Sequence, residues 1–168
     1  MSNEQITKEK SFQQKVAVIV PCYNEEAVIK ESYRRTRTVL DRLPQQTEII
    51  YINDGSIDQT RHLLDSIAAV DPEVKVLHFS RNFGHQPAVT AGINHCDADL
   101  AVIIDADMQD PPELIPDLLE TQAREQANVV YCVRRSRTGE SFFKLFTAKA
   151  FYRVMNRMSE VHFPLDTG

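Results

Sequence analysis

Three aspartates within six residues, Asp105, Asp107 and Asp110, could together bind a metal ion. Asp105 directly follows the apolar run of residues 100–104, which places it at the end of a buried strand. Like charges about 4 Å apart repel by about 4 kcal/mol at an effective dielectric constant near 20, so a cation or raised pKa values must sustain such a cluster. With no His or Cys nearby and Gln109 as a neutral oxygen ligand, the pattern favours Mg²⁺ or Mn²⁺ over a solvated acidic turn.

Other chemistries that use these residue types fit less well. A D-x-D after an apolar strand also occurs in phosphatases of the haloacid dehalogenase type, but on their first strand and followed by Thr or Val, whereas Met108 and Gln109 follow here. Neither G-x-G-x-x-G nor G-x-x-x-x-G-K-[ST] occurs, which disfavours Rossmann dinucleotide and P-loop binding. No G-x-S-x-G occurs, and Cys22 has no evident His partner, so we expect Cys22 to be a small buried residue.

Apolar runs alternate with amphipathic stretches from residue 16 onward. Short apolar runs predict strands over residues 16–20, 48–53, 74–79, 100–104 and 129–133. Helices are predicted over residues 25–43, 58–70, 87–95 and 112–126, with Asp58 as an N-cap. This alternation predicts βαβ units, and therefore an α/β fold with a mostly parallel sheet covered on both faces.

Polar clusters follow four of the predicted strands. They occupy residues 21–26, 53–56, 80–85 and 105–110. Turn formation explains Gly55 and Ser56, but it does not explain the acidic cluster. His85 is the one histidine in these clusters and is a candidate ligand contact. Because open α/β sheets bind ligands at the carboxyl ends of their strands, we expect one site at this edge.

Composition limits the class of protein. The chain has 168 residues, of which 42% are hydrophobic, enough for one domain at 15–168 after a flexible polar leader at 1–14. A net charge of −5 argues against a nucleic-acid partner. Three widely spaced cysteines suit a reducing cytosol. No apolar run reaches membrane-spanning length and no secretory signal precedes the domain, so we expect a cytoplasmic chain without a transmembrane segment.

Four motifs in order carry a resemblance to a known family. They are PCYNEE at 21–26, NDGSIDQT at 53–60, SRNFGHQPA at 80–88 and DADMQDPPE at 105–113. Together they resemble the family-2 inverting glycosyltransferases of GT-A fold. More narrowly, the chain is similar to polyprenyl-phosphate hexosyltransferases of the dolichol-phosphate mannose synthase and bactoprenol glucosyltransferase types. The resemblance runs from about Val16 to the last residue and implies a Rossmann-like, mostly parallel sheet.

The resemblance also implies site residues and partners. A UDP- or GDP-linked hexose donor would be bound by Pro21, Tyr23, Glu25, Asp54, Asp105 and Ala106. Mg²⁺ or Mn²⁺ on the donor diphosphate would be held by Asp105, Asp107 and Gln109. The phosphate of a polyprenyl phosphate acceptor would be bound by Arg135, Lys144 and Thr147. Transfer would invert the anomeric centre in one displacement.

Residues 134–158 hold seven basic side chains and one acidic side chain. Lys149, Arg153 and Arg157 repeat at the spacing of one helical face. Such a basic amphipathic helix can lie on an anionic membrane surface, although a plain surface helix has the same pattern. The resemblance favours the membrane, so we expect the protein at the cytoplasmic face of the membrane.

The resemblance also implies what the chain lacks. Members of the family continue beyond the position of Gly168 with an acidic residue that is their proposed catalytic base, then with further helices and often transmembrane segments. We therefore expect no certain catalytic residue in this chain. Two alternatives stay open: a saccharide acceptor in place of the lipid phosphate, and a nucleotide-sugar-binding fragment without activity.

Overall fold

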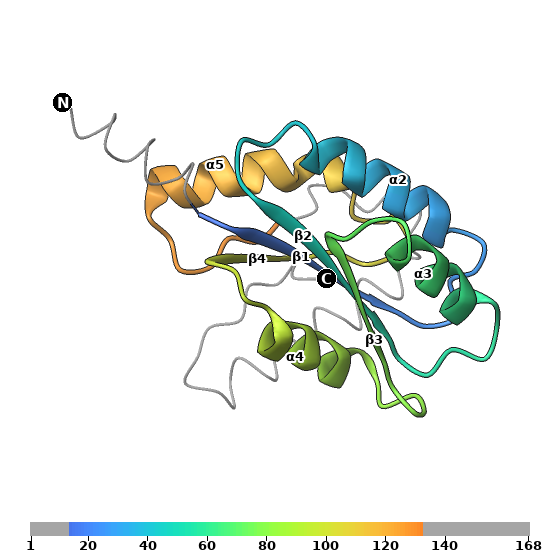
Figure 1. The fold of residues 1–168 in the computed structure, drawn as a ribbon. Coiled ribbons are helices and arrows are strands. Elements are labelled where there is room, and N and C mark those ends of the chain that lie inside the picture. The colour runs from blue at the N-terminus through green and yellow to red at the C-terminus, as the bar shows by residue number, and fades with distance from the viewer. Residues whose placement is uncertain (1–13, 133–168) are drawn as a thin grey trace, which may run out of the picture. The chain divides into compact units, whose positions relative to one another are not determined.

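The computed structural model describes residues 14–132, which include a sheet of four parallel strands. These strands are β1 (Val16–Cys22), β2 (Thr47–Asn53), β3 (Val74–His78) and β4 (Leu100–Ile103). Their order is β3-β2-β1-β4, with β1 paired to β2 on one side and to β4 on the other (Figure 1). The parallel sheet expected from the alternating pattern is confirmed.

Helices connect the strands and cover both faces of the sheet. They are α2 (Ile29–Leu40), α3 (Thr60–Ala68), α4 (His85–His95), the short 3₁₀ helix η1 (Pro112–Leu114) and α5 (Ile115–Glu125). Side chains of α2, α3 and α5 pack on one face of the sheet, and α4 packs on the other (Figure 1). This arrangement leaves the loops after the strands together at one edge.

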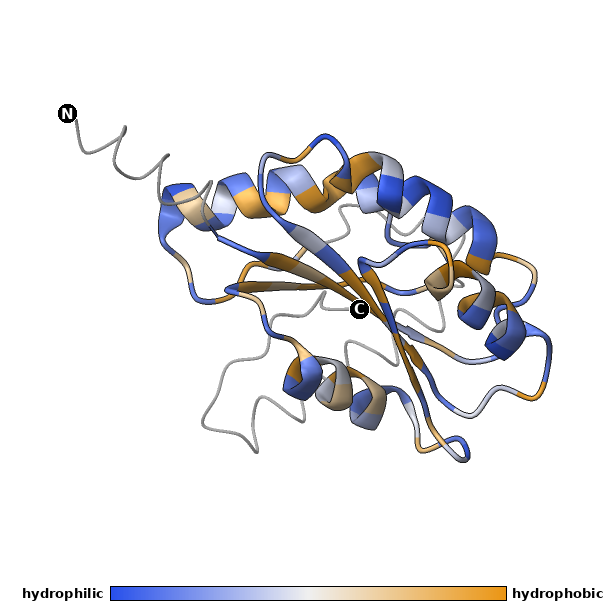
Figure 2. Cartoon of the chain, viewed as in Figure 1, coloured by the Kyte–Doolittle hydropathy of each residue, from blue (hydrophilic) through white to orange (hydrophobic). Residues whose placement is uncertain are grey.

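The core lies on both sides of β1, whose residues are all buried. Val18 faces the core shared with α2, α3 and α5, and Ile19 faces the α4 side. Figure 2 shows apolar strands between helices with both apolar and polar residues. Gly92 lets α4 come close to the sheet, because a Cβ there would meet the side chains of Ile19 and Ile52. Burial on both faces explains why β1 and β2 are so largely apolar in the sequence. The expectation of a buried strand before Asp105 is wrong in part, because β4 is an edge strand in which Ala101 and Ile103 are exposed.

Some predicted boundaries move. The helix expected from residue 25 begins at Ile29, because residues 25–28 form a turn that bonds to a neighbouring loop. Asp58 accepts a hydrogen bond from the Thr60 N–H at 2.9 Å, but α3 begins at Thr60 and Gln59 occupies the N-cap position, so the prediction of Asp58 as the N-cap is wrong by one residue. The predicted strand over 129–133 is wrong for residues 129–132, which adopt no strand. β-Branched and aromatic residues favour a strand through packing against neighbouring strands, so composition alone does not produce one.

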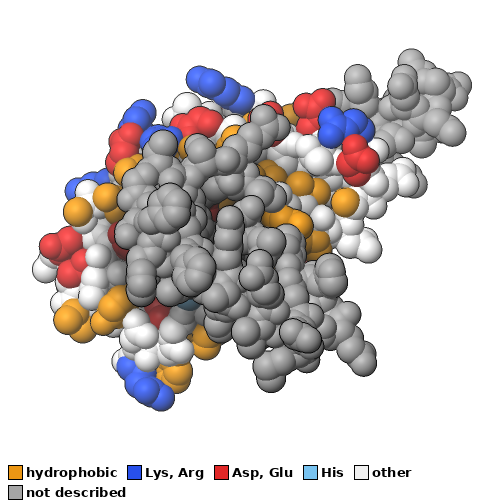
Figure 3. Space-filling view, turned by 180° about the vertical axis from the view of Figure 1, so that it is seen from behind, with side chains coloured by type: hydrophobic (Ala, Val, Ile, Leu, Met, Phe, Trp, Pro, Cys, Tyr) orange, Lys and Arg blue, Asp and Glu red, His pale blue; other side chains and the backbone are white. Residues whose placement is uncertain are grey.

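The rest of the chain, residues 1–13 and 133–168, lies outside the described residues. The basic stretch and the predicted acceptor residues Arg135, Lys144 and Thr147 fall there. Within residues 14–132, no helix is both long and apolar enough to span a bilayer. Acidic and basic side chains are interspersed along the edges of the face shown in Figure 3.

Candidate functional site

A pocket of about 340 Å³ lies at the carboxyl edge of the sheet. Its lining comes from the end of β1, from the loops after all four strands and from the first turn of α4: Pro21, Cys22, Tyr23, Glu25, Asp54, Asn82, Gly84, His85, Ala88, Asp105, Ala106 and Asp107. All six residues predicted to bind a nucleotide-sugar line it, and so does Asp107 of the predicted metal residues. Gln109 is exposed and is not part of the lining. The four polar clusters therefore do meet at one place.

Asp54 fixes the loop between β3 and α4. Its carboxylate, 4% exposed, accepts hydrogen bonds from the backbone N–H groups of Phe83 at 2.7 Å and Gly84 at 2.9 Å. Each oxygen therefore accepts one backbone hydrogen bond and retains a second lone pair, and Asp54 also lines the pocket. Because Phe83 and Gly84 directly precede α4, these two bonds fix the position of the N-terminal end of that helix.

Gly55 allows this loop to come close. Its φ of +68° lies in the left-handed region, which favours glycine. A Cβ at this position would lie 2.6 Å from the backbone nitrogen of Asn82 and would also meet the backbone of Arg81. The β2–α3 loop therefore packs on the β3–α4 loop through bare backbone.

The loop over 23–28 is braced against residues 56–60 by five hydrogen bonds of 2.8–3.1 Å. The N–H groups of Asn24, Glu25 and Glu26 donate to the side chains of Ser56, Thr60 and Asp58, and those of Ile57 and Gln59 donate to the side chains of Asn24 and Glu26. These side chains of the two motifs thus accept backbone hydrogen bonds and hold the two loops together. The side chains of Tyr23 and Glu25, which the brace does not use, line the pocket.

Negative charge accumulates at one side of the pocket. The pKa of Glu25 is raised above its ordinary value, first by burial and then by the charges of Asp107, Asp58 and Asp105. Ionised carboxylates are therefore held near one another at an energetic cost. A cation bound between them would relieve this repulsion.

The loop after β4 presents two of these carboxylates. Asp107 accepts a hydrogen bond from the Gln109 N–H at 2.9 Å, and Met108 between them has a left-handed φ of 61°. No cluster of three or more His, Cys, Asp or Glu side chains within residues 14–132 could enclose a metal ion. Asp105 and Asp107 nevertheless fit Mg²⁺ or Mn²⁺, which commonly bind one or two carboxylates and complete their shell with water and substrate phosphates.

Cys22 and His85 have different environments in the pocket. Burial, followed by the charges of Glu25, Asp58 and Asp54, raises the pKa of the Cys22 thiol to about 12. Cys22 is thus a buried, protonated thiol, as expected, and all three cysteines are free. The Nδ1 atom of His85 lies 3.9 Å from Oδ1 of Asp105, so this imidazole borders the acidic side.

Sequence reasoning assigned no role to three lining residues, Asn82, Gly84 and Ala88. They belong to the motif at 80–88, so their position after a strand was the available signal. Gly84 has a φ of 101°, and Ala88 is fully buried beneath the pocket.

The model of the glycosyl transferase family 2 matches residues 17–164. This chain belongs to glycosyltransferase family 2. Over 152 residues it is 47% identical to an uncharacterized glycosyltransferase, YkcC, of Bacillus subtilis, covering 90% of this chain and 47% of that protein. Over 145 residues it is 39% identical to a bactoprenol glucosyl transferase of Shigella phage SfV, covering 86% of this chain and 47% of that protein. The chain thus spans about half the length of these relatives.

The fold of this family-2 chain is the GT-A fold. A solved mannosyltransferase from Pyrobaculum calidifontis, in complex with GDP-Man and Mn²⁺, matches it with a TM-score of 0.64 at 22% identity. The match covers 86% of this chain and 39% of the mannosyltransferase. The fold expected from the four motifs is therefore confirmed.

Proposed function

We propose that this chain acts in the transfer of a hexose from a nucleotide-sugar to a polyprenyl phosphate, with inversion at the anomeric carbon. The observation that carries the proposal is the single pocket in which Tyr23, Glu25 and Asp54 meet Asp105 and Asp107. A relative named bactoprenol glucosyl transferase supports the lipid phosphate as acceptor. A mannosyltransferase of the same fold holds GDP-Man, which supports a nucleotide-sugar donor.

The nucleoside would lie against Pro21 and Tyr23. Tyr23 is 42% exposed at the rim, so its ring can cover a base or ribose. The Glu25 carboxylate can accept hydrogen bonds from sugar hydroxyls. Asp54 would contact the base with the lone pairs that its backbone bonds leave.

A divalent cation, Mg²⁺ or Mn²⁺, would stabilise the negative charge of the departing nucleoside diphosphate. Asp105 and Asp107 would hold it, with Gln109 as the third ligand that the motif suggests. Besides burial, the charges of Asp107 and Asp105 disfavour the ionised form of Glu25, and a bound cation would reduce that repulsion. Ala106, between the two aspartates, lines the pocket and would contact the nucleotide-sugar.

The acceptor supplies its own nucleophile. A phosphate oxygen is ionised at neutral pH and needs little help from a base. Arg135, Lys144 and Thr147 are the proposed phosphate contacts, in the basic stretch that lies outside the described residues. That stretch supports attachment to an anionic membrane surface at the cytoplasmic face.

Calorimetric titration with UDP and GDP, each with and without Mn²⁺, tests the donor site. We expect one nucleotide to bind in an Mn²⁺-dependent manner, and the Asp105→Ala, Asp107→Ala double variant to lose that dependence. Asp117→Ala, an exposed carboxylate on α5 away from the pocket lining, is the control and should bind as the parent does. Binding of both nucleotides without regard to Mn²⁺ would contradict the proposed metal site.

Transfer itself needs a second assay. Radiolabelled hexose should appear on a polyprenyl phosphate and not on a neutral saccharide when the protein is given the nucleotide-sugar that it binds. Label on the saccharide alone would mean that the acceptor is a saccharide and not a lipid phosphate. Binding of the donor with no transfer to either acceptor would indicate a nucleotide-sugar-binding fragment without activity.

A further inference from the structure

An ion pair ties the loop after β4 to helix α2. The guanidinium of Arg35 donates two hydrogen bonds to the carboxylate of Glu113, from Nε to Oε1 at 3.0 Å and from Nη2 to Oε2 at 2.6 Å. Paired charge-assisted bonds of this kind fix both distance and orientation. Glu113 belongs to η1, directly after the loop that carries Asp105 and Asp107. The two partners are 78 residues apart in sequence.

The same guanidinium also contacts the middle of that loop. Nη1 of Arg35 lies 3.6 Å from Sδ of Met108. Met108 has a φ of 61°, a conformation that a non-glycine residue adopts only when its surroundings hold it. Met108 follows Asp107, and the Gln109 N–H donates to the Asp107 carboxylate. Arg35 therefore contacts this loop at Met108 and the following helix η1 at Glu113.

This restraint opposes a force that the site itself creates. Glu25, on the loop before α2, lines the same pocket as Asp105 and Asp107, and like charges gathered at one pocket repel one another. Repulsion would move the loop after β4 away from the loop before α2. Arg35 lies on the helix that starts at Ile29, just after Glu25, so its contacts connect the two sides.

We propose that Arg35 and Glu113 are a positioning pair that keeps Asp105 and Asp107 at the pocket, so that a divalent cation binds with high affinity. The inference rests on the proposed function of the pocket. The pair touches neither the donor nor the cation, since neither residue lines the pocket.

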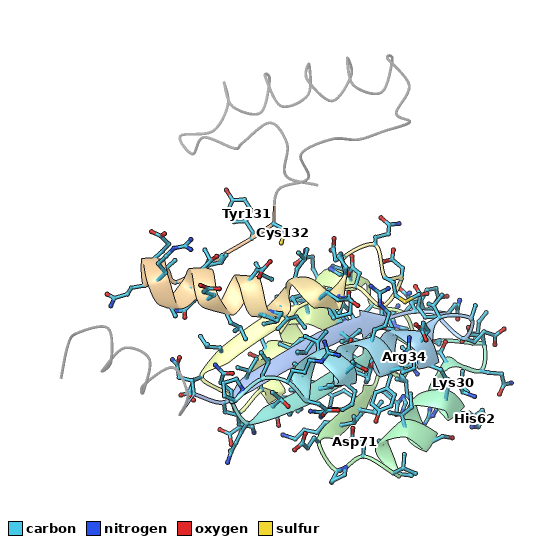
Figure 4. All side chains as sticks on the ribbon, turned by 90° about the horizontal axis from the view of Figure 1, so that it is seen from above. Lys30, Arg34, His62, Asp71, Tyr131 and Cys132 are labelled. Atoms are coloured by element: carbon cyan, nitrogen blue, oxygen red, sulfur yellow. The ribbon has the colours of Figure 1, made fainter. Side chains whose placement is uncertain are left out.

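A neighbouring ion pair provides a matched control. Arg34 makes the same kind of two-bond contact with Glu31, at 2.8 and 2.6 Å, but both residues belong to α2. Figure 4 labels Arg34 and Lys30 on this helix. The Arg34 side chain is 65% exposed, and its pair connects no other element. Arg34→Ala thus removes equal charge and an equal contact without releasing the loop.

The test is an Mn²⁺ titration of the full chain in the presence of UDP or GDP, with free Mn²⁺ followed by its electron paramagnetic resonance signal. We expect Arg35→Ala and Glu113→Gln each to weaken Mn²⁺ binding about tenfold, the lower end of the range for groups that orient metal ligands, because the pair acts on the loop and not on the ligands directly. Arg34→Ala should leave the affinity unchanged. Thermal unfolding should change little in all three, because the pairs are partly exposed.

Rescue separates positioning from a general effect on structure. The exchanged variant Arg35→Glu, Glu113→Arg should recover most of the lost Mn²⁺ affinity. Equal affinity in Arg35→Ala and Arg34→Ala would overturn the positioning pair while leaving the proposed function intact. Absence of Mn²⁺ binding in the parent protein would overturn both.

Discussion

At the scale of single residues, Asp54 shows how one side chain can serve both the fold and the site. A nucleotide-binding role was expected from its motif, and the structure adds two bonds from the backbone of the β3–α4 loop. Because Asn82 and Gly84 of that loop line the pocket, Asp54 shapes the pocket even without touching a ligand.

We expect Asp54→Asn to lower both stability and nucleotide affinity. The new amide group would face a backbone N–H, leaving one buried donor unsatisfied, which should reduce the free energy of unfolding by about 1–3 kcal/mol. Urea unfolding and calorimetric titration with UDP and GDP measure the two effects. Asp99→Asn is the control: the exposed Asp99 accepts one N–H, from Lys15 at 2.8 Å, and an asparagine oxygen can replace that contact. Equal losses of stability and nucleotide affinity in both variants would contradict the role of the two hydrogen bonds that Asp54 accepts.

At the scale of elements, the sequence reveals strands better than helix starts. A strand buried on both faces, such as β1, must be apolar throughout, so its position is visible in the sequence. The start of α2 depends instead on the brace between residues 23–28 and 56–60, which exists only once both loops are folded. The segment 129–132 has strand composition without forming a strand.

The same distinction applies to the site. Residue types at the carboxyl ends of strands were visible, because the sheet topology brings those ends together. Contacts between distant segments, such as Arg35 with Glu113, could not be predicted, since many pairs of opposite charge in the sequence are equally plausible. The placement of Gln109 outside the pocket lining also depends on loop geometry that the motif does not encode.

The brace between these loops makes a prediction of its own. Thr60→Val keeps the volume of a fully buried side chain but removes the hydroxyl that accepts the Glu25 N–H at 2.8 Å. We expect a loss of about 1 kcal/mol in unfolding free energy and weaker nucleotide binding, because the Glu25 loop loosens. Thr38→Val, whose hydroxyl donates only to the Arg34 carbonyl within α2, should leave nucleotide binding unchanged. Unchanged titration curves for Thr60→Val would show that the brace does not position Glu25.

At the scale of the whole molecule, the pocket lies at the carboxyl ends of the strands, whereas stabilising ion pairs lie at their amino ends. The carboxyl edge carries carboxylates that repel one another, as the raised pKa of Glu25 indicates. The opposite edge carries compensated charges. There Arg37 bonds Asp41 at 2.7 Å, Glu73 at 2.6 Å and the Thr47 hydroxyl at 3.0 Å, joining α2 to the segments where β2 and β3 begin. The ion pairs and hydrogen bonds of Arg37 at one edge therefore offset part of the cost of carboxylate repulsion at the other.

The contribution of Glu48 to stability depends on pH. Its carboxylate binds Lys15 at 2.9 Å and Lys75 at 2.8 Å. Burial by itself raises the pKa of Glu48, but the bonds from Lys75 and Lys15 outweigh it, so the folded pKa lies below the ordinary value. A lowered folded pKa means that the contribution to stability is present above the unfolded pKa, about 4.3, and is lost as the pH falls through the folded value.

Replacing Glu48 tests this dependence. We expect Glu48→Gln to lose about 1.5–3 kcal/mol of unfolding free energy at neutral pH, the range for hydrogen bonds to charged groups. The difference from the parent should narrow as the pH drops below about 4.3, because the parent then loses the same charge. Urea unfolding from pH 7 to pH 3 measures this difference in unfolding free energy.

Glu31→Gln serves as the control, because the Glu31 side chain is 45% exposed and its charge is screened. The difference in unfolding free energy between Glu31→Gln and the parent should therefore stay small at every pH. Nucleotide affinity at pH 7 should be unchanged in both variants, since Glu48 lies at the edge opposite the pocket; a loss of affinity in Glu48→Gln would mean that the two edges are coupled.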